Sequence, residues 1–194
     1  IIAIVALARV DRLVKAGNNA LYTNEAVAAA TLRYIASAQA QFQASGAIDT
    51  NNNGMGECGY FAELSGGVGV RDSGGTASTD RIAPPILSGA FARVATQTGI
   101  TGGVVTRSGY QFQMYLPSST GIGVPEADTG GVGATTPDAA QSEVLWCCYA
   151  WPFSFGNSGN KTFFVNQSGD VLMTKNLGQR YGGATKVPAY TAAF

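Results

Sequence analysis

The first 45 residues constrain the fold of this chain more than any other stretch. They contain no proline and are rich in alanine, leucine, arginine and glutamine, which are good helix formers. An apolar side chain recurs at every seventh position, at Leu7, Val14, Leu21, Ala28, Ile35 and Phe42. This pattern predicts one amphipathic helix over residues 1–45. At about 1.5 Å per residue, such a helix is about 65–70 Å long.

A helix of that length exceeds the diameter of a domain built from residues 46–194. We therefore expect residues 25–45 to pack on this head domain and residues 1–24 to project from it. The projecting part starts with eight uncharged residues, too few to cross a bilayer, which takes about 20. Their apolar surface needs a membrane or other copies of the chain. The predicted self-assembly residues are Ile1, Ile2, Ile4, Val5, Leu7, Val10, Leu13, Val14 and Leu21.

Charged and weakly helical residues follow the apolar tip. A charge inside a bundle of helices needs a partner, and the mixed signs here predict pairing between neighbouring copies; a solvated helix face is the alternative. Three weak helix formers, Gly17-Asn18-Asn19, predict a local unwinding or bend, and Ser45-Gly46 predicts the end of the helix. The candidates for inter-subunit charge pairing are Arg9, Asp11, Arg12 and Lys15.

Residues 46–194 are typical of a β-rich head domain. Residues 110–116 alternate cleanly, with Tyr110, Phe112, Met114 and Leu116 on one face, which predicts a strand. Residues 144–151 are also strand-like, and residues 163–165 and 171–173 flank a short loop, as in a hairpin. We predict an α+β fold, with the long N-terminal helix packed on a small antiparallel sheet of about three or four strands.

The segments between the predicted strands are loops and short packing elements. Residues 65–80 and 121–137 are rich in glycine, serine and threonine, which predicts long surface loops. Residues 60–64 are typical of a short helix, and the aromatic Tyr190 and Phe194 indicate that the C-terminal tail is docked on the head.

The composition argues against two classes of function. Twelve basic and twelve acidic residues cancel, so the chain has no basic field that would attract nucleic acid. Histidine is absent, which removes the commonest general base and the commonest metal ligand. Two acidic pairs, Asp138 with Glu143 and Glu57 with Glu63, have no spacing that favours catalysis. We therefore expect a protein that is not an enzyme and has no cofactor.

The three cysteines are too few for a disulfide scaffold and lack metal-binding spacing. If residues 144–151 form a strand, Cys147 and Cys148 point to opposite faces, so only one of them can meet Cys58. We expect one disulfide between Cys58 and one of this pair, which suits an oxidising compartment. Three reduced cysteines that pack as small apolar groups are the alternative.

Two further motifs suggest sites on the head. Oxygen-bearing side chains and glycines in residues 49–57 match the opening of a calcium-binding loop, with Asp49, Asn51, Asn53 and Glu57 as candidate ligands. The twelfth position is Tyr60 instead of glutamate, and a polar turn held by Asx hydrogen bonds is the alternative. Asn160 and Asn166 each begin an N-glycosylation sequon, a pattern that also arises by chance.

Together these features resemble the type IV pilin and pseudopilin superfamily. Residues 1–8 are similar to the later part of that family's hydrophobic N-terminal helix, and residues 25–42 resemble the helix of one bacterial branch, in which an Asp/Asn/Gly turn follows. The next matches are Gly59-Tyr60-Phe61, Tyr149-Ala150-Trp151-Pro152 and residues 160–170. The matches cover about half of the chain, and their order along it carries the resemblance.

The resemblance implies a subunit made as a precursor in the inner membrane, clipped, and assembled with its own copies into an extracellular filament. The family normally starts with phenylalanine and has a glutamate five residues in, where this sequence has Ile1 and Val5. We expect that several N-terminal residues precede this sequence; registration through the charged residues after position 8 is the alternative. A minor pseudopilin of a secretion system and a membrane-tethered secreted hydrolase are the competing functions.

Overall fold

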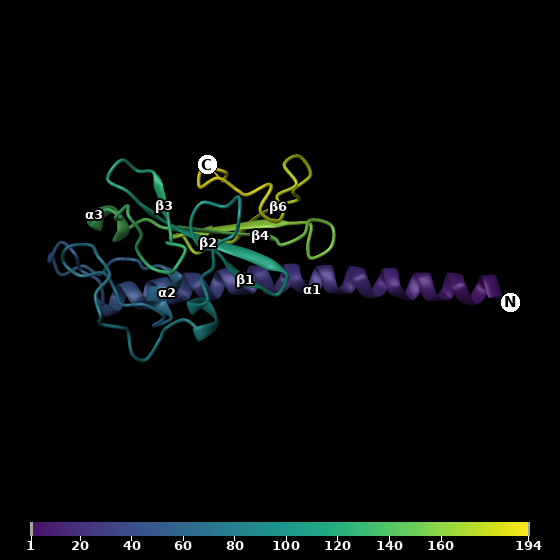
Figure 1. Ribbon diagram of the computed structural model, residues 1–194, viewed down its shortest axis with the longest axis horizontal. Helices are drawn as coiled ribbons and strands as arrows, with labels where there is room; N and C mark the ends of the chain where they lie inside the picture. The colour runs from purple at the N-terminus through teal and green to yellow at the C-terminus, as the bar shows by residue number, and fades with distance from the viewer. Residues whose placement is uncertain (1, 194) are drawn as a thin grey trace.

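The N-terminal helix dominates the shape of the molecule (Figure 1). The structure is a computed structural model that describes the backbone of residues 2–193 and the side chains of residues 17–193. Helix α1 spans Ile2–Ser45. It ends as predicted, because Gly46 follows with a positive φ of 63° and donates its N–H to the carbonyl of Gln43. The predicted interruption is wrong: α1 runs unbroken through Gly17-Asn18-Asn19, since a few weak helix formers cost too little to break a helix that continues on both sides.

The head contains an antiparallel sheet, which confirms the α+β prediction. Within residues 2–193 it has six strands. Five follow the order β1-β2-β4-β5-β6, and the sixth, β3, pairs with the same edge of β2 as β1 does. The sequence predicted fewer strands because three of them have only three residues and no detectable alternation. The strands are β1 (Val105–Arg107), β2 (Tyr110–Pro117), β3 (Gly123–Pro125), β4 (Cys147–Pro152), β5 (Thr162–Asn166) and β6 (Leu172–Thr174).

Three short helical segments complete the described part of the head: α2 (Phe61–Leu64), the 3-10 helix η1 (Gly89–Ala92) and α3 (Ala139–Ser142). The predicted short helix at residues 60–64 is therefore confirmed as α2. The hairpin prediction is also confirmed, because β5 and β6 pair with Phe164 opposite Leu172.

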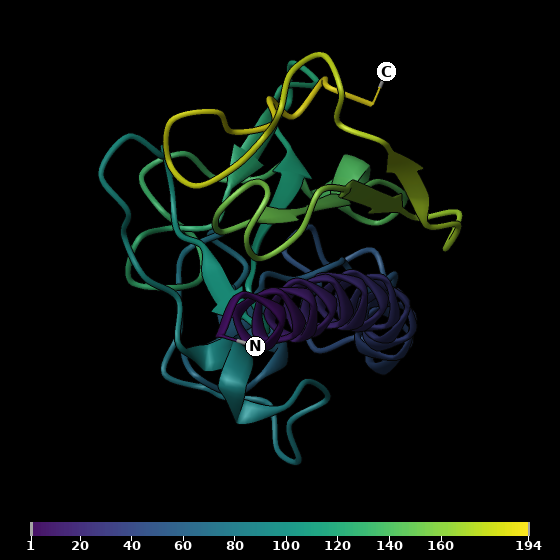
Figure 2. The same ribbon diagram turned by 90° about the vertical axis from the view of Figure 1, so that its right-hand side faces the viewer.

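The sheet lies between α1 on one face and the C-terminal tail on the other (Figures 1 and 2). On the α1 side, Leu32, Ile35 and Phe42 of the helix form one buried cluster with side chains of the sheet. The alternation predicted for β2 is confirmed, since Tyr110, Phe112, Met114 and Leu116 all belong to this inner cluster.

The opposite face of the sheet is buried as well, which the sequence did not predict. Tyr115, Tyr149, Trp151 and Phe164 form an outer cluster there, and Tyr190 of the tail packs against it. The tail is held by hydrogen bonds from the Tyr149 hydroxyl to the Tyr190 carbonyl (2.8 Å) and from the Trp151 indole to the Gly183 carbonyl (2.9 Å). Docking of the tail is thus confirmed for Tyr190, whereas Phe194 lies outside the described residues.

The predicted disulfide is not formed, because Cys58, Cys147 and Cys148 are free thiols. Cys147 and Cys148 do lie on opposite faces of the sheet, in the outer and inner clusters respectively. Cys58 is anchored elsewhere, with its N–H donating to the Ser142 carbonyl and its own carbonyl accepting from Arg71. Burial raises the pKa of Cys58 and Cys147 to about 12, so the three thiols act as small apolar groups, the alternative considered above.

Packing of α1 on the sheet predicts a large cost for removing one core side chain from the helix. Leu32 is fully buried, and Leu32→Ala should lower the free energy of unfolding by about 2–5 kcal/mol, because it leaves a cavity in the inner cluster. Urea denaturation followed by circular dichroism measures this change. The neighbouring Arg33 is exposed, and Arg33→Ala should change the free energy by less than about 0.5 kcal/mol. Equal effects of the two substitutions would contradict the described packing.

Candidate self-assembly surface

Contact between α1 and the head begins at Asn24 and Glu25. The Asn24 side-chain amide donates to the Ser158 carbonyl at 2.9 Å. Glu25 is only 5% exposed: one carboxylate oxygen accepts the N–H of Asn160 at 3.0 Å, and the other lies 2.8 Å from the Lys161 ammonium. These contacts fasten the loop between β4 and β5 to the helix. They fix the point along α1 at which the head starts.

Helix α1 continues well beyond this contact point. In Figure 1 its N-terminal half extends away from the sheet and the loops, which gather along the other half. Most of the first side chains described in this half are open to solvent: residues 17–20 and Thr23 are exposed, and Tyr22 is 66% exposed. Leu21 among them is half-buried. The projecting part of α1, residues 2–23, therefore forms the candidate assembly surface.

Most of the residues predicted to act in assembly lie on this projecting part. Leu21 is there with its half-buried side chain. Ile1 lies outside the described residues. The remaining ones belong to the backbone of α1, while their side chains are not among those described: Ile2, Ile4, Val5, Leu7, Arg9, Val10, Asp11, Arg12, Leu13, Val14 and Lys15.

The projecting helix is suited to association with other helices. A lone helix in water is only marginally stable, and most helices in proteins are held by packing of an apolar stripe. Here the sequence repeats apolar residues at Leu7, Val14 and Leu21, in the half of α1 that extends away from the sheet and the loops in Figure 1. Burial of such a stripe against copies of the chain stabilises by about 25 cal/mol per Å² of apolar surface.

The calcium-loop arrangement is not formed. Glu57 turns into the core, where it accepts the N–H of Thr50 at 2.7 Å and pairs with Arg71. Asp49 accepts the N–H groups of Asn53 and Gly54. The side-chain amides of Asn51 and Asn53 both donate to the Glu143 carboxylate at 2.8 Å. Among the described residues no cluster of three or more acidic, cysteine or histidine side chains is arranged to hold a metal ion. The polar turn stabilised by Asx hydrogen bonds describes this loop.

The two sequons lie in different surroundings. Asn160 is exposed beside the junction of α1 with the head. Asn166 is half-buried, and its side-chain oxygen accepts both the N–H and the hydroxyl of Ser168. Glycosylation of either asparagine stays a prediction.

Arg71, Glu57 and Glu63 form a buried ion cluster at α2 that sequence reasoning missed. The Arg71 guanidinium lies 3.3 Å from Glu57 and 3.1 Å from Glu63, and all three side chains are 1% exposed or less. It also donates to the Cys58 carbonyl. Glu57 and Glu63, considered above as a catalytic pair, thus bind a shared arginine as a structural ion pair. The only signal for this in the sequence is a lone arginine in a glycine- and serine-rich segment.

Comparison with known proteins identifies the family. Residues 18–191 match the family described as "Protein of unknown function (DUF2950)". The chain belongs to the DUF2950 family. No curated protein and no solved structure matches it. The DUF2950 match begins within the last residues of the projecting part of α1, at residue 18, and continues through the part of α1 that packs on the head and through the head to residue 191. In the part of the chain that the structure describes, no helix is long and apolar enough to span a membrane.

One buried carboxyl within the DUF2950 match, that of Glu126, organises the loop around β3. It is fully buried and accepts N–H groups from Phe61 (3.1 Å), Ala62 (2.8 Å) and Gly131 (2.9 Å). These bonds tie the residues that follow β3 to the start of α2. Burial raises the pKa of Glu126 to about 8, although the three N–H groups act in the opposite direction.

The raised pKa of Glu126 predicts that the free energy of unfolding of the head falls as the pH rises. Its ordinary pKa of 4.5 applies to the unfolded chain, so between pH 4.5 and about 8 the folded state binds more protons than the unfolded state. The free energy of unfolding should therefore fall across this range, by a few kcal/mol in all. Denaturation at a series of pH values measures the slope, to which the raised pKa of buried Glu63 adds with the same sign.

Glu126→Gln isolates this contribution. A glutamine stays neutral, so the decrease in the free energy of unfolding between pH 4.5 and 8 should become smaller in this variant. Asp128→Asn, a change of the same type at an exposed position, is the matched control and should keep the slope of the unchanged protein. An unchanged slope in Glu126→Gln would show that Glu126 does not titrate in this range.

Proposed function

We propose that this protein is the repeating structural subunit of an extracellular, pilus-like filament that assembles through the projecting part of α1. The observation that supports the proposal is the contact point at Asn24 and Glu25. The head packs on α1 from there on, while the helix extends in the other direction beyond it (Figure 1). A head with a helix of this kind resembles the pilin architecture inferred from the sequence.

The geometry favours an open polymer over a closed pair. Copies that pack the projecting helices side by side, each displaced along the axis, form heterologous contacts that repeat without closing. In such a bundle the heads lie around the helices, and the apolar stripe at Leu7, Val14 and Leu21 becomes buried. The mixed charges of Arg9, Asp11, Arg12 and Lys15 then find partners on neighbouring copies.

The proposal also assigns a location and a class of protein. The filament lies at the cell surface, and the unassembled subunit is held in the inner membrane as a precursor. Its partners are copies of itself, and its role is structural, without catalysis or nucleic-acid binding. The formal net charge of zero and the lack of histidine are compatible with this role.

Placing charge on the apolar stripe tests the proposal. The double substitution Leu7→Lys and Val14→Lys should abolish fibres at concentrations at which the unchanged protein forms them, because each buried lysine would lack a counter-charge. Negative-stain electron microscopy and sedimentation measure assembly. The melting temperature of the head should stay the same, since neither position lies in the part of α1 that packs on the sheet.

Asn19→Lys is the matched control. Asn19 is exposed on the projecting helix, away from the heptad positions, so the added charge should leave fibres intact. Long uniform fibres from the unchanged protein fit a major subunit, whereas short assemblies only would indicate the minor pseudopilin. A full-length protein that stays monomeric at all concentrations would contradict both.

A further inference from the structure

The head has two ends along the axis of α1, and they differ in charge. At the end where the helix leaves the head, which we call the proximal end, the β4–β5 loop is bound to Asn24 and Glu25. At the other, distal end α1 stops at Ser45 and β2 stops at Pro117, whose carbonyl accepts the N–H of Asp138. Figure 1 shows α3 at the distal end and β6 in the half of the head nearer the projecting helix.

Three exposed basic side chains gather at the proximal end. The end of β6 pairs with the start of β5, so Lys175, the residue after β6, lies next to the β4–β5 loop. The Arg180 guanidinium lies over the ring of Phe155 in that loop, 6.0 Å from the ring centroid. Lys186 belongs to the next turn of the tail, where its carbonyl accepts the N–H of Gly182. We call Lys175, Arg180 and Lys186 the basic face, and all three are exposed.

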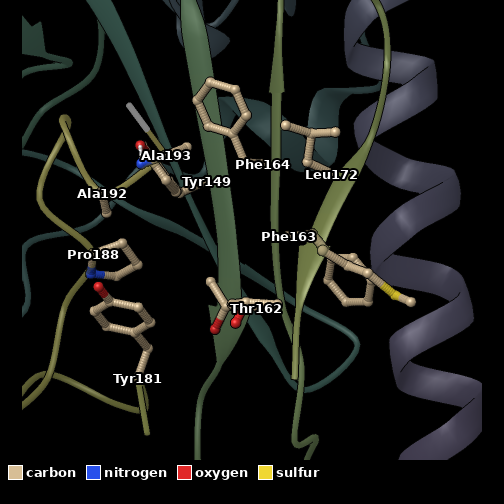
Figure 3. Close-up of a pocket in the computed structure, with 11 residues that line it drawn as sticks. Tyr149, Thr162, Phe163, Phe164, Leu172, Tyr181, Pro188, Ala192 and Ala193 are labelled. Carbon is tan, nitrogen blue, oxygen red and sulfur yellow. Dashed lines mark hydrogen bonds between the residues drawn. The ribbon is translucent and has the colours of Figure 1, made fainter. Parts of the chain in front are cut away.

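The segment that carries the basic face is fastened to the sheet. Asn176 is buried, and its side chain exchanges two hydrogen bonds with the backbone of Tyr181, at 2.7 and 2.9 Å. In Figure 3 Tyr181 lies on the tail, across from Thr162 at the start of β5. The Gly183 N–H donates to the Pro152 carbonyl at the end of β4. These contacts hold the basic side chains at one place on the head.

A cleft of about 330 Å³ opens between the β4–β5 loop and the basic face, lined by Phe153, Phe155, Arg180 and residues 182–185 among others. Phe153 is 52% exposed. None of the described lining residues is acidic, and Asp170, the only acidic residue that the sequence has beyond β4, lies in the loop at the other end of β6. Exposed aromatic rings beside arginine are typical of protein interfaces, so this end of the head is suited to bind an acidic protein surface.

Three aspartates give the distal end the opposite charge. Asp49 follows the end of α1, and Asp138 caps the start of α3. A cleft of about 280 Å³ connects these elements with the turn that Asp72 starts, since its lining includes Thr50, residues 73–75 and Asp138. We call the three aspartates the acidic face.

The acidic face keeps its charge at neutral pH and has no basic residue close to it in the sequence. Asp72 is exposed, and its carboxylate accepts the N–H groups of Gly74 and Thr76, which lower its pKa. The two longer segments that build this end, residues 46–57 and 117–143, contain no lysine or arginine. The two ends of the head are therefore complementary in charge.

The length of the projecting helix matches the length of the head along α1. Helix α1 has 44 residues, and the projecting part, residues 2–23, is half of them, about 33 Å. Residues 24–45, which pack on the head, are the other half. A second copy displaced by this length along the axis sets its proximal end against the distal end of the first, while its projecting helix runs beside the first head.

We propose that the basic face of each head contacts the acidic face of the next copy along the filament. This inference rests on the proposed filament and adds which surfaces of neighbouring heads meet. The contact is heterologous, because two different faces meet, so it repeats without closing. Complementary charge fixes the register and disfavours wrong arrangements, in which like charges face each other.

Reversing the charge of each face separately, and then of both together, tests the inference. Lys175→Glu with Lys186→Glu should raise the critical concentration for fibre formation about tenfold at low salt, because acidic groups then face each other. Asp72→Lys with Ser119→Lys should do the same from the other side; Ser119 is exposed and lines the distal cleft. The chain with all four substitutions should recover the original critical concentration, since the reversed faces are complementary again. Sedimentation of a dilution series measures this concentration, and circular dichroism checks that each head is folded.

A matched control separates the position of the charges from their number. Arg81→Glu with Arg93→Glu makes the same change in net charge at exposed positions outside both faces, and should leave the critical concentration unchanged. Equal effects of the control and the face variants would overturn the inference, as would a chain with all four substitutions that does not recover.

The remaining outcomes distinguish this inference from the proposed function. Fibres that form equally well from every variant overturn the contact between heads and leave the filament standing, whereas an unchanged protein that forms no fibres at any concentration overturns both. Cosedimentation with phosphatidylglycerol vesicles tests a competing partner. If Lys175→Glu with Lys186→Glu abolishes vesicle binding and leaves fibres unaffected, the basic face belongs to a membrane surface and the inference is overturned.

Discussion

The structure depends on the burial of one stripe of α1 against the inner face of the sheet. Leu32, Ile35 and Phe42 are each fully covered there, and they bring the helix into contact with strands β4 and β5. Because the side chains of a strand alternate, the choice of residues that face the helix also decides which residues face away. That choice leaves Tyr115, Tyr149, Trp151 and Phe164 on the outer face. An exposed aromatic surface of this size needs cover, and the C-terminal tail supplies it.

Polar contacts fix the segments that the apolar core cannot specify. Gln39 is buried on α1, and its amide exchanges hydrogen bonds with the backbone N–H and carbonyl of Gly59. A side chain at position 59 would collide with Leu64 and Phe42, so glycine allows this close approach. From Gly59 the chain enters α2, where Arg71 binds Glu57 and Glu63, and Glu126 accepts three backbone N–H groups. The long loops of the head are thereby attached to α1 by buried, directional bonds.

Local sequence patterns predicted the elements that are long or strictly periodic. Helix α1 and strand β2 follow from apolar spacing, because each buries a face that its own residues define. The β5–β6 hairpin follows from two short apolar runs that flank a polar loop. The unbroken passage of α1 through Gly17-Asn18-Asn19 did not follow, since propensity is a weak guide when the helix continues on both sides. The Arg71 cluster depends on side chains brought together by the fold, and no local pattern encodes it. The same holds for Gln111 and Gln113 of β2, which are buried and donate to Gln97 and to the Thr101 carbonyl. For the assembly surface, the sequence predicted where the apolar residues lie, and the structure adds the point at which the head begins.

That point has a mechanical consequence for any assembly through the projecting helix. Glu25 is held by the Asn160 N–H and the Lys161 ammonium, and the Tyr110 hydroxyl in turn donates to the Lys161 carbonyl. Tyr110 belongs to β2, an interior strand that pairs with β1 on one side and β4 on the other. The helix, the β4–β5 loop and the sheet are therefore joined within a few residues of the place where α1 leaves the head. Because α1 has no break at this point, the orientation of the head is set by the orientation of the helix. Helices packed side by side would then present every head, and the outer face of every sheet, in one repeating orientation.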